Sequence, residues 1–358
     1  MVLSSLLKTL KKEGSPVSHN NMGEIYEEGR ILRKSYRKAA KWYERAASNG
    51  SAIGMYNLAR LYEEGKGVPR DSDKAMQLVV SAAEAGLSDA QSHLGWRYIT
   101  GYNTEKNVEE ALGWYNLAAE RGNELALVSL GSIYRRGEQV PKDNDKAKMY
   151  FSKAANRGSA DGSFNMGSIL EEEGDPEGAV KHFRISAYRG KAEAMYKLGT
   201  HYESGIGLEQ DFEKALMIYG EAALLGDADA QNGIGRMYRE GRGIEKDSIE
   251  AAKWFRISAK RGNLNAIYNL ADLYSSGDGV RRNPRRAARL YRMVADRGLP
   301  EGHLRLGIMY SFGIGVRADR SMALRHLKEA VRMGCDEAEE QLKKLTDKEP
   351  EKHQRICE

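Results

Sequence analysis

The residue types that most often carry catalysis or bind metals are scattered in this sequence of 358 residues. Its seven histidines (residues 19, 93, 182, 201, 303, 326 and 353) show neither a metal-ligand spacing nor that of a base beside a nucleophile. The two cysteines, Cys335 and Cys357, lie near the end of the chain and form no disulfide framework. Nothing supports a catalytic pair of Cys335 with a histidine. We therefore expect no catalytic residues, no metal and no cofactor.

Paired glycines are the other feature that could indicate a binding site, because Gly-x-Gly loops can hold phosphate groups. They occur at Gly65/Gly67, Gly205/Gly207, Gly241/Gly243, Gly277/Gly279 and Gly313/Gly315. Each pair follows a helical pattern rather than a strand, and the pairs recur at regular intervals. This favours turns, in which glycine permits left-handed backbone at the end of a helix.

The recurrence extends over almost the whole chain. One glycine closes each unit, at positions 50, 86, 122, 158, 190, 226, 262, 298 and 334. The interval is 36 residues throughout, except for 32 residues between Gly158 and Gly190. A period of this length is typical of a stacked repeat array with one continuous core.

Each unit predicts two helices. The first carries a leucine or isoleucine, a glycine or alanine beside it, and a tyrosine on the same face, as in Leu270, Ala271 and Tyr274. The second begins with a residue type that caps helices, four residues before an alanine. These caps are Ser35, Asp71, Asn107, Asp143, Asp175, Asp211, Asp247, Asn283 and Asp319. The fifth unit lacks four residues between its helices, so its loop must be tighter.

These motifs identify a resemblance. They read AMYKLGTHY at 194–202, GKGV at 65–68, DSDKA at 71–75 and WYERAA at 42–47. The pattern resembles the Sel1-like repeat family over about residues 17–334. The resemblance implies an all-α solenoid of helix pairs stacked in a right-handed superhelix, similar to tetratricopeptide arrays and used as an adaptor between proteins. Some relatives carry a disulfide in each unit, which this sequence lacks, and the family has no shared catalytic motif to transfer.

The expected organisation is a capping helix at 1–16, nine repeats, a C-terminal capping helix at 335–345 and a disordered tail at 346–358. The nine repeats are 17–50, 51–86, 87–122, 123–158, 159–190, 191–226, 227–262, 263–298 and 299–334. The first helix is read as a cap over the first repeat, with docking to a partner or membrane as the alternative.

The composition of the chain limits which class of partner it could bind and in which compartment it could lie. Fifty-six basic and 51 acidic residues give a net charge of +5, too mild and too well mixed to indicate nucleic acid. No stretch approaches the roughly 20 apolar residues of a membrane span. The N-terminus lacks the features of a signal peptide, and no cysteine recurs in the repeats. We therefore expect a cytoplasmic protein.

A binding surface is predicted on the first helices, opposite the face that carries the leucine and tyrosine. In related arrays this face lines the concave groove, and its occupants differ from unit to unit. The candidates are Tyr56, Arg60, Trp96, Ile99, Arg135, Tyr196, Arg236, Arg239, Tyr268 and Asp272. Trp96, Arg236 and Arg239 stand out because Trp and Arg are enriched at interface hot spots. The alternatives are packing against a neighbouring unit for Trp96 and, for the two arginines, salt bridges along the helix to Glu240 or Asp272.

A second candidate is a basic docking patch for an acidic protein surface, formed by Arg281, Arg282, Arg285, Arg286 and Arg289. Its alternative is a solvated face neutralised by nearby acids. The sequence thus predicts a non-catalytic scaffold that holds a protein or peptide partner in its groove and regulates, neutralises or assembles it. The alternatives are an enzyme, hydrolytic or ligand-modifying, whose site is not visible in the sequence, and self-association of the array.

Overall fold

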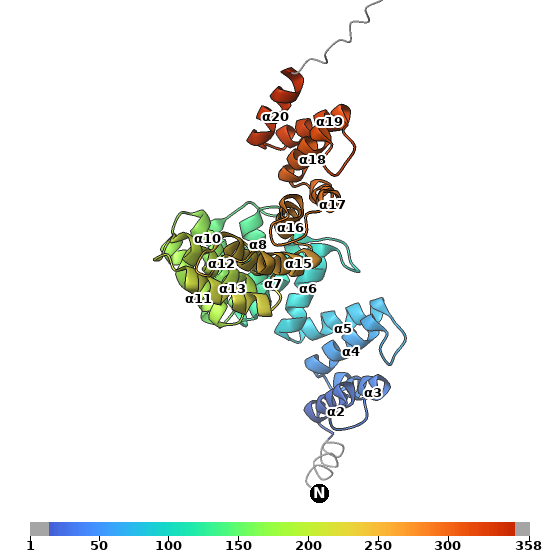
Figure 1. Ribbon diagram of the computed structural model, residues 1–358. Coiled ribbons are helices and arrows are strands. Elements are labelled where there is room, and N and C mark those ends of the chain that lie inside the picture. Colours follow the sequence, from blue (N-terminus) through green and yellow to red (C-terminus); the bar gives the residue numbers. More distant parts are fainter. Residues whose placement is uncertain (1–13, 348–358) are drawn as a thin grey trace, which may run out of the picture. The chain divides into compact units, whose positions relative to one another are not determined.

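The computed structural model describes residues 14–347, which form nineteen helices and no strand (Figure 1). Nearly all of the expected N-terminal capping helix, and of the expected tail, lies outside these described residues. The all-α repeat solenoid predicted from the sequence is confirmed within them.

The helices fall into two bodies that meet in sequence between Glu173 and Gly174. The first body contains α2 (Pro16–Glu28), α3 (Tyr36–Ser48), α4 (Ala52–Glu64), α5 (Ser72–Glu84), α6 (Ser88–Thr100), α7 (Val108–Glu120), α8 (Glu124–Arg136), α9 (Asn144–Asn156) and α10 (Ala160–Glu172). The second contains α11 (Pro176–Tyr188), α12 (Ala192–Ser204), α13 (Phe212–Leu224), α14 (Ala228–Glu240), α15 (Ser248–Lys260), α16 (Leu264–Ser276), α17 (Pro284–Ala295), α18 (Pro300–Phe312), α19 (Arg320–Arg332) and α20 (Asp336–Asp347).

The start of every second helix is fixed by the cap predicted for it. In each of the nine, the side chain of the capping residue accepts a hydrogen bond from a backbone N–H of the first turn. The Asp71 carboxylate, for example, accepts from the Lys74 N–H at 2.9 Å. Such a bond satisfies a donor that has no partner inside the helix, so these boundaries follow from local sequence.

Two kinds of glycine set the spacing of the helices. Gly235, beside Ile234 on α14, lies against the ring of Phe255 on α15, and a Cβ there would be 2.5 Å from that ring. Gly279, with φ of +66°, lies against the backbone of Ser248 at the start of the preceding second helix, where a Cβ would overlap the Ser248 carbonyl. The first kind joins the helices of one unit, and the second kind joins consecutive units.

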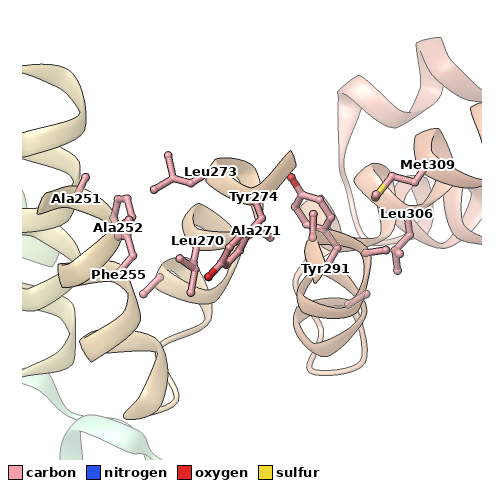
Figure 2. Packing of buried hydrophobic residues seen from close by; sticks show 14 residues of the cluster. Ala251, Ala252, Phe255, Leu270, Ala271, Leu273, Tyr274, Tyr291, Leu306 and Met309 are labelled. Atoms are coloured by element: carbon pink, nitrogen blue, oxygen red, sulfur yellow. The ribbon is translucent and has the colours of Figure 1, made fainter. Parts of the chain in front are cut away.

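Within each body, every helix packs against the next one along the chain. First helices of consecutive units also contact one another, as α2 does with α4 and α12 with α14. Buried side chains pack across the borders of the units. Figure 2 shows one cluster in the second body in which Phe255, Leu270, Tyr274, Tyr291 and Leu306 come from four successive helices, α15 to α18, which belong to three units.

The short fifth unit has the tight connection that its sequence requires. α10 ends at Glu172 and α11 begins at Pro176, with Asp175 as its cap and Gly174 at φ of +81° between them. The Gly-x-Gly loop that five of the other units carry is missing here, and the border of the two bodies falls in this connection.

Candidate functional site

All ten predicted groove residues lie on first helices: α4, α6 and α8 in the first body, and α12, α14 and α16 in the second. Consecutive first helices contact one another through α6 with α8 and α12 with α14, and side-chain bonds join α4 to α6 and α14 to α16. In each body a pocket beside these helices includes predicted residues.

The pocket of the first body, here called the aromatic pocket, has a volume of about 530 Å³. It is lined by Tyr56 of α4, by Asp89, Ser92, His93 and Trp96 of α6, by Tyr115 of α7 and by Leu125 and Ser129 of α8. The His93 ring lies 5.7 Å from both the Tyr56 and the Trp96 ring centres. Trp96 keeps 41 % of its surface exposed and Leu125 keeps 70 %, so packing within the array leaves both accessible.

Helix α6 forms one wall because Asp89, His93 and Trp96 follow one another at intervals of four and three residues, which places them on the same helix face. Beneath this wall lies Arg97, whose side chain has no exposed surface. Its Nη2 is 2.5 Å from a carboxylate oxygen of Glu63 on α4, and its Nε donates to His93 Nε2 at 3.2 Å. Burial, together with the Arg97 charge, lowers the pKa of His93 to about 4, and His93 is therefore neutral at pH 7.

The pocket of the second body, here called the polar pocket, has a volume of about 400 Å³. It is lined by Arg239, Asp272, Leu273, Ser275, Ser276, Asp278, Tyr291, Arg305, Ile308, Met309 and Ile314. Asp272 accepts a hydrogen bond from the Tyr291 hydroxyl at 2.5 Å, and Arg305 Nε donates to the Tyr268 hydroxyl at 3.0 Å. Burial, with the Asp272 charge beside it, raises the pKa of Tyr291. Asp272 and Arg305 are thus engaged with tyrosine hydroxyls, and the two charged groups lie 3.9 Å apart.

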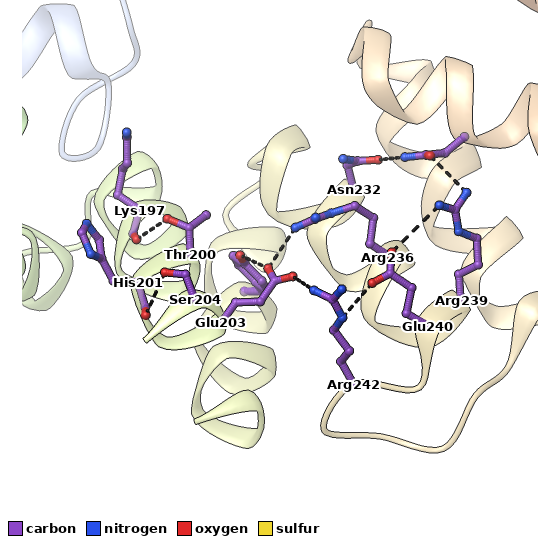
Figure 3. A network of polar contacts seen from close by, with 12 residues as sticks. Lys197, Thr200, His201, Glu203, Ser204, Asn232, Arg236, Arg239, Glu240 and Arg242 are labelled. Atoms are coloured by element: carbon purple, nitrogen blue, oxygen red, sulfur yellow. Dashed lines mark hydrogen bonds and ion pairs between the residues drawn. The ribbon is translucent and has the colours of Figure 1, made fainter. Parts of the chain in front are cut away.

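Arg236 and Arg239 take part in a polar network between units rather than projecting freely (Figure 3). Glu203, 8 % exposed, accepts from the Tyr219 hydroxyl at 2.8 Å and from Arg236 at 2.9 Å. Arg242 adds a third contact to Glu203 at 3.2 Å. Arg239 donates to Asn269 of the next unit at 3.2 Å. Arg236 therefore forms a salt bridge with Glu203 of the preceding unit rather than along its own helix, whereas Arg239 bonds to an amide and lies 3.9 Å from Glu240 of its own helix.

The same arrangement occurs at the start of the array. Glu27 of α2 accepts from the Tyr43 hydroxyl at 2.7 Å and pairs with Arg60 of α4 at 2.6 Å. The remaining predicted residues also have partners in the array. Arg135 contacts Glu172 at 2.5 Å, Ile99 packs against the cluster around Tyr115, and Tyr196 stacks on Tyr219 at 5.8 Å. Only Tyr56, Trp96, Arg239 and Asp272 of the ten predicted residues line a pocket described here.

Some functional side chains were missed at the sequence level. Glu27, Glu63 and Glu203 all lie 23 residues before the closing glycine of their unit, and this recurrence was the available signal for the buried carboxylates. His303 and His326 gave no signal, yet their Nδ1 atoms are 2.9 Å apart, beside a cavity of about 440 Å³. Burial and the positive charges of His303, Arg325 and Arg292 lower the pKa of His326 to about 4.

The predicted basic patch lies at the start of α17 and in the loop before it, and its five arginines are exposed. Arg286 stacks over the Tyr274 ring at 4.4 Å, and Arg282 donates to the Ser275 carbonyl at 3.0 Å. None of the five forms an ion pair with an acid among residues 14–347.

Within residues 14–347, no three His, Cys, Asp or Glu side chains are placed to hold a metal ion together. No helix in the same stretch has both the length and the apolar character needed to cross a bilayer.

Helix pairs, repeat-spaced caps and pockets on the first helices define a helical-repeat protein of the kind that commonly serves as a protein-interaction scaffold. The Sel1 repeat model matches residues 16–51, 52–87, 88–123, 125–159, 192–227, 228–263, 264–299 and 300–335. The chain belongs to the Sel1 repeat family. The interval 160–191, which contains the short fifth unit, is not among the matched segments.

Solved structures agree with this assignment. The chain is similar to a protective antigen of uropathogenic Escherichia coli with an SLR fold, with 29% identity over 97% of this chain and 75% of that one, and a TM-score of 0.81. It is also similar to a Sel1 repeat protein from Oxalobacter formigenes, with 31% identity over 85% and 90% of the two chains and a TM-score of 0.66. A comparison with curated proteins gave no match.

Proposed function

We propose that this protein is a non-catalytic scaffold that binds a protein or peptide partner on the face of its first helices, with the aromatic pocket as the principal anchor. The observation that carries the proposal is the exposure of Trp96, at 41 %, in the wall of a pocket that also exposes Leu125. Aromatic and aliphatic side chains placed in this way are typical of interface hot spots, where covering them removes apolar surface from water.

The predicted residues differ in how well they are placed to bind a partner. Trp96 lines a pocket and is accessible, whereas Arg236 and Arg239 are 35% and 29% exposed and bond to neighbouring units. A change at either arginine would weaken the array together with any binding. Substitutions at Trp96 and Leu125 therefore test binding in the groove more directly than substitutions at the two arginines.

The basic patch is proposed as a second contact, for an acidic surface of the same partner, since its five arginines have no acidic partner in the described part of the chain. We place the protein in the cytoplasm. This rests on the sequence, in which no cysteine recurs in the repeats. Binding of this kind suits a protein that regulates or neutralises an enzyme by holding it.

The test is affinity capture from native cells with the wild-type protein, Trp96→Ala and Leu224→Ala as baits. Leu224 is 90% exposed at the end of α13, a second helix, so Leu224→Ala controls for the loss of an exposed apolar side chain elsewhere. We expect a stoichiometric partner with wild type and Leu224→Ala and its loss with Trp96→Ala, at equal helicity by circular dichroism. Undiminished capture by Trp96→Ala would show that the groove assignment is wrong.

A further inference from the structure

We propose that the aromatic pocket binds a cationic side chain, arginine or lysine, of the partner protein. This inference rests on the proposed function and specifies the chemistry of its anchor.

The charge of the pocket lining is negative. The lining contains one carboxylate, that of Asp89, and no lysine or arginine, and burial keeps His93 neutral. Asp89 Oδ1 accepts from Asn123 Nδ2 at 2.7 Å. No hydrogen bond to Asp89 Oδ2 occurs in the part of the chain that the structure describes. An anionic ligand would be repelled here, and a purely apolar ligand would cover this carboxylate without replacing its water.

The two arginines whose charges act on Tyr56 are already paired with acids. Arg97 lies behind the wall and pairs with Glu63 at 2.5 Å. Arg60 of α4 pairs with Glu27 at 2.6 Å. Neither arginine is part of the lining, and neither supplies a free cation to Asp89.

The rest of the lining suits a cation. Tyr56 and Trp96 line the pocket with aromatic rings, and the face of such a ring attracts a guanidinium or ammonium within about 6 Å of its centre. Ser92, Ser129 and the Tyr115 hydroxyl add oxygen atoms that can accept hydrogen bonds. Arginine brings five N–H donors and lysine three, with no acceptor of their own. The N–H donors of the ligand can therefore bond to the oxygen atoms of the pocket, and its positive charge can pair with the Asp89 carboxylate.

The chain supplies an internal comparison at the equivalent place of the second body. Tyr196 and Asp229 correspond there to Tyr56 and Asp89, and Asp229 accepts from Asn263 at the same distance of 2.7 Å. At the position of Trp96 the second body has Arg236. Burial raises the pKa of Tyr196, Asp229 raises it further, and the Arg236 charge opposes them. In the second body the residue at this position is Arg236, a cation of the chain that pairs with Glu203. In the first body Trp96 takes its place, and the lining of the aromatic pocket contains no cation of the chain.

The experiment is selection of a displayed library of random peptides of about twelve residues on the full-length protein, followed by calorimetry with the selected peptides. Each selected peptide is also made with citrulline for arginine, or with norleucine for lysine, which keeps shape and removes charge. Asp89→Asn removes the charge of the pocket but keeps the bond from Asn123. Asp229→Asn is the matched control, because it makes the same change at the equivalent position.

We expect the selected peptides to share an arginine or lysine whose neutral replacement weakens binding at least about tenfold, equivalent to about 1.4 kcal/mol. Asp89→Asn should weaken binding to a similar extent and Asp229→Asn less than about twofold. Two results would contradict a cationic ligand: peptides that need Trp96 but bind equally well after their basic residue is replaced, and peptides that bind Asp89→Asn as tightly as wild type. Neither result would contradict the scaffold function. Selection of no peptide, or only of peptides indifferent to Trp96→Ala, would overturn both.

Discussion

The contact between Arg97 and Glu63 is the most deeply buried ion pair described in this chain, since the Arg97 side chain has no exposed surface and Glu63 is 16% exposed. Each nitrogen of the Arg97 guanidinium has a partner: Nη2 donates to Glu63, Nε donates to His93, and Nη1 contacts the sulfur of Met76 at 3.5 Å. A buried charge of this kind is tolerated because its partner is in place, and removing that partner leaves the charge uncompensated in a medium of low dielectric constant.

Glu63→Ala should therefore destabilise the first body by about 3 kcal/mol. The control is Glu329→Ala, which breaks an equally short but exposed pair with Arg332. Exposed pairs contribute little, so the control should leave the denaturation midpoint almost unchanged. Urea denaturation followed by circular dichroism measures both variants. Equal midpoints for Glu63→Ala and wild type would mean that Arg97 finds water or another acceptor when Glu63 is lost.

For single residues, the sequence predicted on which helix face a side chain lies better than it predicted which residue that side chain contacts. The helical period placed Tyr56, Trp96, Arg239 and Asp272 on the face that carries the pockets. It did not show that Arg236 reaches Glu203 of the preceding unit, because a repeat pattern gives the direction of a side chain but not which neighbour lies within its reach. Pairing across units depends on the stacking distance, which is a tertiary property.

The helix pair is the element that local sequence determines most completely. Each second helix begins at its predicted cap because the cap bonds to the first turn of its own helix, with no help from neighbouring units. Stacking of units depends instead on glycines in the loops. Gly279 touches the backbone of the preceding unit, whereas a Cβ at Gly298, with φ of +89°, would meet nothing within 4 Å. The two positions share a left-handed backbone and differ in their contacts.

Comparing Gly279→Ala with Gly298→Ala therefore separates the loss of stability caused by backbone strain from the loss caused by disturbed stacking of the units. Both variants carry the cost of an alanine in the left-handed region, about 1 kcal/mol. Gly279→Ala must in addition push its loop away from Ser248, so it should lose at least about 2 kcal/mol more, in the range of core overpacking. Denaturation midpoints of the two variants give the comparison. A loss of equal size in both would show that the loop moves aside freely and that Gly279 does not hold the units together.

On the scale of the whole molecule, the 36-residue period predicted a repeat array, and its single interval of 32 residues marked the one irregular unit. That unit is where the Sel1 model has no match and where the border between the two bodies falls. The sequence could indicate the irregularity because a missing loop is a local deletion. It could not indicate that contacts divide there, because this depends on the packing of every helix on both sides.

An array in which each unit contacts only its neighbours should respond locally to a local defect. Glu63→Ala should raise amide hydrogen exchange in α4, α5 and α6 and leave α14 to α18 at wild-type protection, while Gly279→Ala should do the reverse. Opening of one group of helices costs less than global unfolding when few contacts connect it to the rest, and exchange measured by mass spectrometry on peptides from each helix resolves the two groups. Each variant serves as the control for the other, since both lower total stability but at separate places. A uniform rise along the whole chain in either variant would mean that all units unfold together, and that neighbour-to-neighbour stacking is not what sets the stability of this protein.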